Sequence, residues 1–185
     1  MTAMKDLVPD RYEVTFRLYP YVWSADQGAS APVQHPVVIA GGGPIGLATA
    51  LDLGRRGVPV LVLDDHEGTG QGSKALCFSK RTLEICDRLG AATPMLNKGV
   101  IWNVGKVFYD DRLLYEFNLL PESGHAFPAF INLQQPYFEK YLHDAIVAAK
   151  AAGAPIEIRG KNRVDNVRQD GDHVTIDVMT PDGPY

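Results

Sequence analysis

Three glycines at a fixed spacing are the residues in this sequence that most directly suggest chemistry. Gly41, Gly43 and Gly46 form a G-x-G-x-x-G pattern within the stretch VVIAGGGPIG. The first glycine permits a tight turn, the second lets the backbone touch a pyrophosphate, and the third lets a helix pack closely on a strand. Pro44 suits a first helical position, because its missing N–H needs no partner there. Together with Ile45 it opens a helix whose free backbone N–H groups attract anions, so the pattern predicts a phosphate-binding turn.

An acidic residue follows at the position where a ribose contact is expected. The stretch 58–64, VPVLVLD, is apolar in the manner of a strand buried on both faces, and it ends at Asp64, 18 residues after Gly46. A carboxylate there can accept hydrogen bonds from a ribose diol, and the neighbouring Asp65 is the poorer candidate. Turn and acid together predict a dinucleotide site, with a structural turn and a surface aspartate as the alternative. The turn alone does not distinguish FAD from NAD.

The elements that would position these residues form a strand–helix–strand unit. We expect a strand over 37–40, a helix over 44–56 and a second strand over 58–64. Such a unit implies parallel strands joined by a right-handed crossover. The rest of the chain mixes helices with antiparallel pieces, so the expected class is α/β with a parallel core and added antiparallel strands. The further elements expected are a helix over about 80–89 capped by Ser79, two strands within 100–118 around the turn DDR, a loop over 120–130, a helix over about 135–152, a strand over 155–159 and a hairpin over 162–180 that turns at Asp170-Gly171-Asp172.

The first 35 residues read as an extension that precedes the organised domain of residues 36–185. Within it, YEVTFRLYPY alternates in character and fits a strand or an extended arm, whereas SADQGASAP reads as a polar linker. The start of the chain has no apolar core and no small-residue cleavage site of a signal peptide, so we expect a cytoplasmic protein.

Composition excludes several classes of function. A net charge of −4 without a Lys/Arg cluster argues against a nucleic-acid partner, and no apolar run approaches the length of a membrane span. Cys77 and Cys86 are too few for a disulfide framework, and we expect both to be small buried thiols. The five histidines are scattered, and none is expected to pair with a carboxylate or cysteine in a metal site.

Three stretches in a fixed order resemble the flavin-dependent aromatic hydroxylases, the single-component monooxygenases that include p-hydroxybenzoate hydroxylase. They are VVIAGGGPIGLATALDLGRRGVPVLVLD, GSKALCFSKRTLEICDRLG at 72–90 and INLQQPYFEKYLHDA at 131–145. The sequence is most similar to the 3-(3-hydroxyphenyl)propionate hydroxylase type, over about residues 36–185. The resemblance implies a Rossmann-like FAD-binding domain of the FAD/NAD(P)-binding fold, with the substrate-domain strands beginning near 100–118.

The same resemblance assigns roles to individual residues. The glycine turn at 41–46 would hold the FAD pyrophosphate, and Asp64 would bind the adenosine ribose. Ser73 and Lys74 would lie along the flavin ribityl chain or ring, and Gln135 would contact the FAD from the start of its helix, where a purely helical role is the alternative. Lys74 departs from the arginine usual in the family, and lysine keeps the charge but loses the bidentate fork.

The activity implied by the resemblance is hydroxylation of a phenolic ring by FAD, with NAD(P)H as reductant and O2 as the oxygen source. No residue is assigned a catalytic role, and no acid–base pair or metal site is expected. The aromatic residues Trp102, Phe108, Tyr109 and Tyr115 fit a substrate pocket or a sheet core equally well. A homodimer is compatible with the sequence, which leaves the oligomeric state open.

Two other functions remain in competition with this one. The chain ends before the second flavin signature of the family, an Asp-Gly-x-x-Ser that follows a strand, so a truncated FAD-binding module without catalytic activity is one alternative. An NAD-dependent dehydrogenase is the less favoured one, because it predicts further strand–helix repeats after residue 90.

Overall fold

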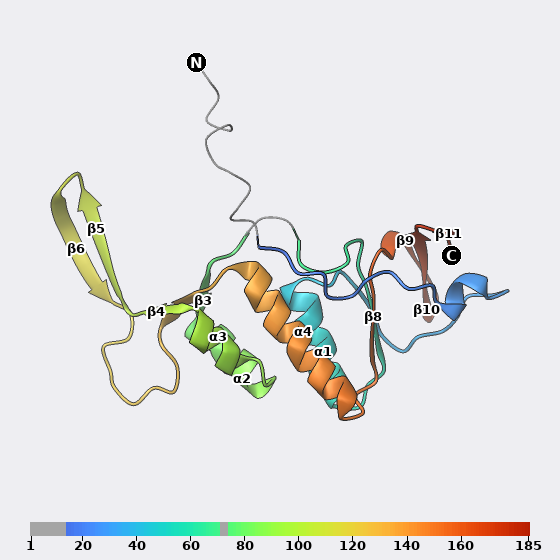
Figure 1. Cartoon of the computed structure of the whole chain (residues 1–185), viewed down its shortest axis with the longest axis horizontal. Coiled ribbons are helices and arrows are strands. Elements are labelled where there is room, and N and C mark those ends of the chain that lie inside the picture. The colour runs from blue at the N-terminus through green and yellow to red at the C-terminus, as the bar shows by residue number, and fades with distance from the viewer. Residues whose placement is uncertain (1–13, 71–73) are drawn as a thin grey trace, which may run out of the picture.

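Three parallel strands form a central sheet that lies between helices on one face and antiparallel strands on the other (Figure 1). The computed structural model describes residues 14–70 and 74–185. The parallel strands are β1 (Val38–Ala40), β2 (Val60–Leu63) and β8 (Ile156–Arg159), in the order β1-β2-β8. The expected α/β class, with a parallel strand–helix–strand core, is confirmed.

The alternation of side chains along β2 explains why both faces of this sheet are covered. Val60 and Val62 point into a core made with the helices, whereas Leu61 and Leu63 pack against the antiparallel layer. Successive side chains of a strand point to opposite faces, so four consecutive apolar residues need a cover on each side. Both faces of the parallel sheet are therefore covered, and the glycine turn and Asp64 follow the carboxyl ends of β1 and β2.

Two long helices cover one face of the parallel sheet. They are α1 (Pro44–Arg55), which joins β1 to β2, and α4 (Gln135–Ala151), which leads into β8. A Cβ atom added at Gly54 would lie 2.2 Å from Cγ1 of Ile156, so α1 reaches the sheet this closely because that residue is glycine. Leu47 and Leu51 of α1 are fully buried in this core.

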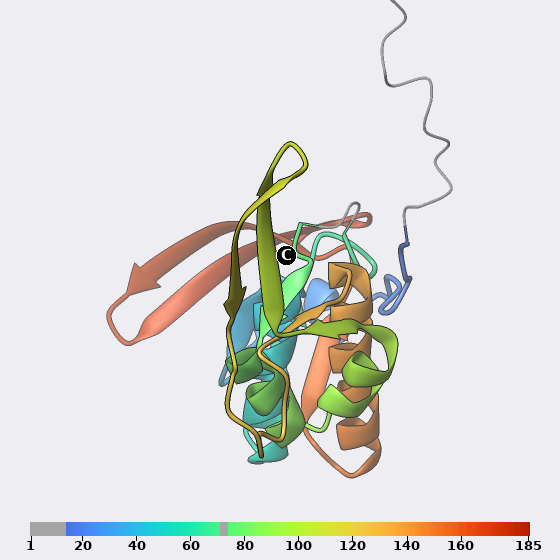
Figure 2. The ribbon, with the colours of Figure 1, turned by 90° about the vertical axis from the view of Figure 1, so that its left-hand side faces the viewer.

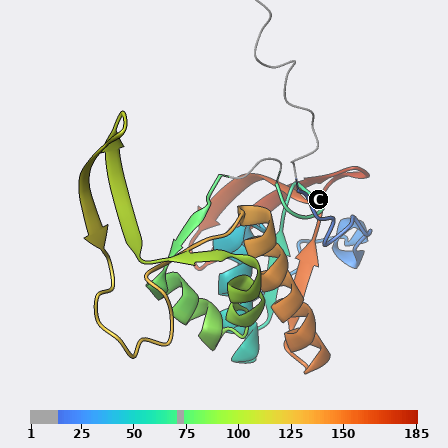
Figure 3. The same cartoon turned by 60° about the vertical axis from the view of Figure 1, so that its left-hand side comes forward.

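Two shorter helices extend the same core and lie beside α1 and α4 in Figure 3. Ser79 caps α2 (Lys80–Arg88) by accepting a hydrogen bond from the Thr82 N–H, as expected. The following α3 (Ala92–Lys98) was not anticipated, because its N-cap is Ala91, which offers no side-chain cap.

A small antiparallel sheet beside these helices was expected only in part, since just one of its strands lies within the strand-like segment 100–118. It comprises β3 (Cys77–Ser79), β7 (Phe130–Asn132) and β4 (Val100–Trp102), with β7 in the middle. Each strand has three residues, which is too short for a period-two pattern, and part of β7 falls in the segment that we expected to be a loop.

The two strands expected within 100–118 form a hairpin that extends away from the helices (Figures 1 and 2). They are β5 (Val104–Tyr109) and β6 (Arg112–Asn118), paired antiparallel. Phe108, Tyr109 and Tyr115 are exposed here, so in this chain they form neither a sheet core nor a closed pocket. Trp102 instead stacks on Phe130 in the small sheet.

The second antiparallel layer covers the face of the parallel sheet opposite the helices. It contains β9 (Arg163–Asp170), β10 (His173–Thr180) and β11 (Gly183–Pro184), and β9 and β10 form the expected hairpin with Gly171 at φ +57° in its turn. Val178 of β10 packs with Leu61 and Leu63 of β2.

The described part of the N-terminal extension, residues 14–35, is an arm that lies on the domain; we call it the N-terminal arm. In Figure 1 it runs in blue across the upper ends of α1 and α4 toward β10. The segment SADQGASAP, expected to be a polar linker, instead contains a 3-10 helix at Ala25–Gly28. Tertiary contacts hold it there: Asp26 pairs with Arg159, and Gln27 donates a hydrogen bond to Thr180.

None of the helices in the described ranges combines the length and apolar character needed to cross a membrane.

Candidate dinucleotide site

The glycine turn follows the carboxyl end of β1, at one edge of the parallel sheet. Gly41 has φ +105°, a backbone conformation that favours glycine, and its N–H donates to the carbonyl oxygen of Leu63 at 2.7 Å. A Cβ atom at Gly46 would lie 1.9 Å from the carbonyl oxygen of Gly41. Glycine is therefore required at both positions for the turn to close onto the start of α1.

Gly43 is the N-cap of α1 and is open on the side where a side chain would point. A Cβ atom built there would meet no heavy atom within 4 Å. The first helical hydrogen bond runs from the Leu47 N–H to the Gly43 carbonyl oxygen, so the amides of Ile45 and Gly46 precede the helical ladder and Pro44 has none to donate. Such a terminus, with free amides and the positive end of the helix dipole, suits a phosphate group.

Asp64 immediately follows β2 and is bound to the glycine turn. Its Oδ2 atom accepts the Gly42 N–H at 2.5 Å, and its Oδ1 atom accepts the His66 N–H at 2.7 Å. The side chain is only 11% exposed. A carboxylate offers about four lone-pair positions, so these two amides leave acceptor capacity for a ribose hydroxyl.

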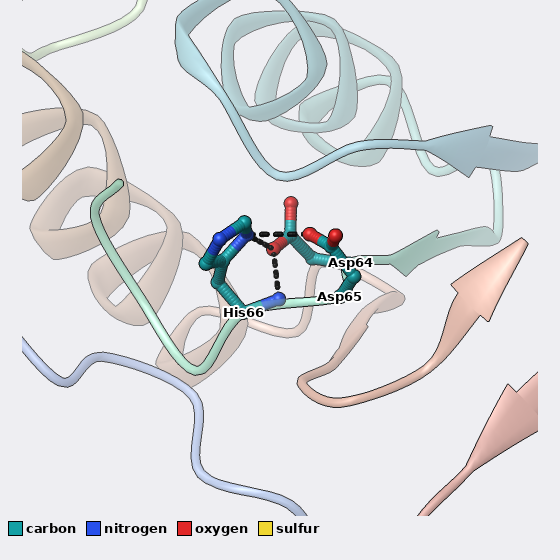
Figure 4. Close-up of side chains that lie close together, drawn as sticks. All are labelled: Asp64, Asp65 and His66. Atoms are coloured by element: carbon teal, nitrogen blue, oxygen red, sulfur yellow. Dashed lines mark hydrogen bonds and ion pairs between the residues drawn. The ribbon is translucent and has the colours of Figure 1, made fainter. Parts of the chain in front are cut away.

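Asp64, Asp65 and His66 cluster at the end of β2, as Figure 4 shows. The Nδ1 atom of His66 lies 2.5 Å from a carboxylate oxygen of Asp65 and 3.5 Å from one of Asp64. A second histidine, His35, also bonds a carboxylate, that of Asp26. The chain turns directly after the strand, and this folds neighbouring side chains onto one another. Asp65 is half exposed and bonds this histidine.

The two distant stretches that carry Lys74 and Gln135 lie next to each other. The Gln135 N–H donates to the Ala75 carbonyl oxygen at 3.1 Å, and the Leu133 N–H donates to the Leu76 carbonyl oxygen at 2.7 Å. Lys74 is exposed, and Gln135 is the first residue of α4. Ser73 lies outside the described residues.

Glu139 is a buried acid in this region that the sequence analysis did not single out. It is 4% exposed, and its Oε1 atom accepts a hydrogen bond from Nε2 of Gln135 at 2.7 Å. Burial raises the pKa of the Glu139 carboxyl, and the charge of Asp64 adds to this effect, although the hydrogen bonds from Gln135 and the Gly70 backbone oppose it. Its position one helical turn after Gln135 is the signal that could have identified it.

Tyr19 of the N-terminal arm is the second residue that the sequence did not reveal. It is 6% exposed, and its hydroxyl lies 3.2 Å from the Gly42 carbonyl oxygen and 3.0 Å from the Gly68 carbonyl oxygen. Burial and the nearby charges of Asp64, Glu139 and Asp65 raise its pKa, so the hydroxyl keeps its proton and acts as a donor. No local pattern identifies such a contact, because it joins segments that are distant in the sequence.

This combination of parallel strands, a glycine turn and an acid after the second strand defines a domain of the dinucleotide-binding class. The profile of the FAD binding domain family matches residues 34–183. The chain belongs to that family.

Individual relatives agree with this assignment. The chain is 31% identical to a probable NADH-specific resorcinol 4-hydroxylase of Rhodococcus jostii over 80% of its own length and 27% of the relative's length. It is 25% identical to a 3-(3-hydroxy-phenyl)propionate/3-hydroxycinnamic acid hydroxylase of Mycolicibacterium smegmatis, over 84% of this chain and 27% of that protein. The expected resemblance to flavin-dependent aromatic hydroxylases is confirmed.

A solved structure shows the same fold. The crystal structure of p-nitrophenol 4-monooxygenase from Pseudomonas putida DLL-E4 superposes with a TM-score of 0.69 at 28% identity, covering 82% of this chain and 38% of that one. The chain thus spans roughly a quarter to two fifths of the length of the proteins it matches.

Proposed function

We propose that this chain supplies the FAD-binding part of a monooxygenase that hydroxylates a phenolic substrate with NAD(P)H and O2. The observation that carries the proposal is the meeting of an open glycine turn and Asp64 at one edge of the parallel sheet, in a chain of the FAD binding domain family. The names of the relatives support the reaction class, since they include a resorcinol hydroxylase and a hydroxyphenylpropionate hydroxylase.

In this proposal, different residues of the site bind different parts of the cofactor. The turn at 41–46 holds the pyrophosphate on the amides at the start of α1, and Asp64 accepts the ribose hydroxyls. The positive charge of Lys74 and the amide of Gln135 lie along the flavin half, together with Ser73, while Asp65 stays at the periphery. FAD when bound supplies the redox chemistry, and the protein positions it.

The remainder of the enzyme is also a proposal. Residues 36–185 form the FAD-binding domain, and the hairpin β5–β6 within 100–118 begins the substrate domain, where its exposed aromatic residues would be covered. NADPH or NADH as reductant, a homodimer and a cytoplasmic location remain predictions.

The two competing functions make different demands on the fold. A dehydrogenase requires further strand–helix repeats, whereas β3, β4 and β7 form an antiparallel sheet and β5 and β6 an antiparallel hairpin. A non-catalytic FAD module shares the whole site with our proposal, and only turnover separates the two.

Purification and spectroscopy test the proposal directly. We expect the 185-residue protein to bind FAD and to show the visible absorption bands of an oxidised flavin. Addition of NADH or NADPH, with and without resorcinol or 3-(3-hydroxyphenyl)propionate, then measures nucleotide oxidation. A protein that binds NAD but no FAD would contradict the proposal, and FAD binding without any NAD(P)H oxidation would favour the non-catalytic module.

A further inference from the structure

The N-terminal arm lies along the loop that follows Asp64. This loop, residues 66–70, carries backbone groups that bond the arm in an antiparallel manner: Leu18 N–H and Tyr19 N–H both donate to the Glu67 carbonyl oxygen, and Thr69 N–H donates to the Phe16 carbonyl oxygen. Side chains add to this contact. Glu67 accepts hydrogen bonds from the Arg17 guanidinium and from the Tyr21 backbone, and Thr69 accepts the Phe16 N–H.

Two glycines of the domain make room for the backbone of the arm. A Cβ atom at Gly68 would lie 2.0 Å from the Phe16 carbonyl oxygen, and one at Gly160 would lie 2.0 Å from the Tyr19 carbonyl oxygen. Neither distance can be tolerated by a side chain. A side chain at either position would therefore displace the arm.

The Tyr19 side chain carries the contact from this loop to the glycine turn. Its hydroxyl lies within hydrogen-bond distance of the Gly68 carbonyl oxygen on one loop and of the Gly42 carbonyl oxygen on the other. The Asp64 carboxylate bonds the N–H of the same Gly42. Tyr19 and Asp64 therefore hold the two sides of a single turn residue.

We propose that the N-terminal arm is a clamp that fixes the glycine turn and the 66–70 loop around Asp64, with Tyr19 as a positioning residue for the dinucleotide. The proposal rests on FAD as the ligand, and it concerns residues 14–21, which precede the family match that begins at residue 34. Holding both loops in the binding geometry before the ligand arrives lowers the conformational entropy lost on binding.

A second anchor keeps the arm in place beyond the clamp. The Asp26 carboxylate pairs at 2.7 Å with Arg159, the last residue of β8, whose side chain is 7% exposed. Tyr21 donates a hydrogen bond to Asp182 at 2.6 Å. The arm is thus bound at one end to the loops of the site. At the other end it is bound to the end of β8 and to the turn between β10 and β11.

The matched pair Tyr19→Phe and Tyr21→Phe tests the clamp. Each substitution removes one hydroxyl from the same arm. The Tyr19 hydroxyl contacts the two loops, whereas the Tyr21 hydroxyl bonds Asp182 away from them, and the Asp26–Arg159 pair still holds that end of the arm in Tyr21→Phe. We expect Tyr19→Phe to weaken FAD binding by about three- to tenfold, the range of one hydrogen bond, and Tyr21→Phe to change it by less than about twofold. Equal dissociation constants for Tyr19→Phe and wild type would overturn the proposal, and so would tighter binding, which would mean that the arm competes with FAD.

Hydrogen exchange of the FAD-free protein provides a second measurement. We expect faster exchange in segments 41–43 and 66–70 for Tyr19→Phe and unchanged exchange there for Tyr21→Phe. Unchanged exchange in both variants would overturn the clamp whether or not FAD binds. Wild-type protein that binds no FAD would instead contradict the proposed function, while exchange would still decide whether Tyr19 orders the loops.

Discussion

The Oδ2 atom of Asp64 lies 2.5 Å from the backbone nitrogen of Gly42. This hydrogen bond connects the acid expected to bind a ribose with the turn expected to bind a pyrophosphate. Two motifs that are 22 residues apart in the sequence thereby form one continuous surface at the edge of the sheet.

Replacing Asp64 should weaken cofactor binding far more than replacing its neighbour. Asp64→Asn keeps the size of the side chain but removes the charge and one of two acceptor oxygens, and hydrogen bonds to charged groups contribute about 1.5–3 kcal/mol. We expect FAD affinity to fall about ten- to a hundredfold, measured by fluorescence titration. Asp65→Asn is the control and should change affinity by less than about twofold, since Asp65 is half exposed and bonds His66. Similar losses in both variants would contradict the assignment of the ribose to Asp64.

Two glycines of the turn should respond differently to alanine. The new methyl group of Gly43→Ala meets no neighbouring atom, so we expect a stability loss of at most ~1 kcal/mol from the alanine N-cap. We expect weaker FAD binding, because the methyl group occupies space left for the pyrophosphate. Gly46→Ala places its Cβ atom 1.9 Å from the Gly41 carbonyl oxygen and should destabilise the protein by about 2–4 kcal/mol. Urea denaturation of both variants measures the change in stability, and FAD titration measures the change in affinity. A Gly43→Ala variant that binds FAD like wild type would place the pyrophosphate elsewhere.

The pH dependence of stability should depend on Glu139. Burial raises the pKa of this carboxyl above its ordinary value of 4.5, so the folded protein binds more protons than the unfolded chain at pH values between the two. The contribution of Glu139 to stability is therefore complete below pH 4.5 and is lost as the pH rises through the raised pKa. We expect Glu139→Gln to gain stability relative to wild type as the pH is raised from acid to neutral, as followed by thermal melting. A stability difference between Glu139→Gln and wild type that stays constant over this pH range would contradict the raised pKa of Glu139.

The two cysteines should differ in reactivity. Cys77 is exposed, contrary to the expectation of a buried thiol. Cys86, on α2, is buried in the core of the domain, and burial raises the pKa of its thiol to about 11. The thiolate is the reactive form. At pH 8 we expect one thiol per chain to react rapidly with a disulfide reagent and the second only after unfolding. Two equally fast thiols would contradict the burial of Cys86.

Much of the fold could be predicted because its signals are local. The glycine turn, the proline that opens α1, the Ser79 cap and the glycine in the β9–β10 turn each act within a few residues, and the structure confirms all of them. The sheet of β3, β7 and β4 could not be predicted in this way. Its three-residue strands depend on partners that are far away in the sequence.

The sequence by itself determined the class of the domain, the glycine turn and the position of Asp64, because glycine geometry and the apolar run of β2 leave few alternatives. Only the tertiary structure decided that Tyr19 lies on Gly42, that Glu139 is buried beside Gln135, and that the N-terminal arm is bound. The physical reason is that such contacts arise when the chain closes on itself. Their stability comes from burial and hydrogen bonds between distant segments, which no local pattern records.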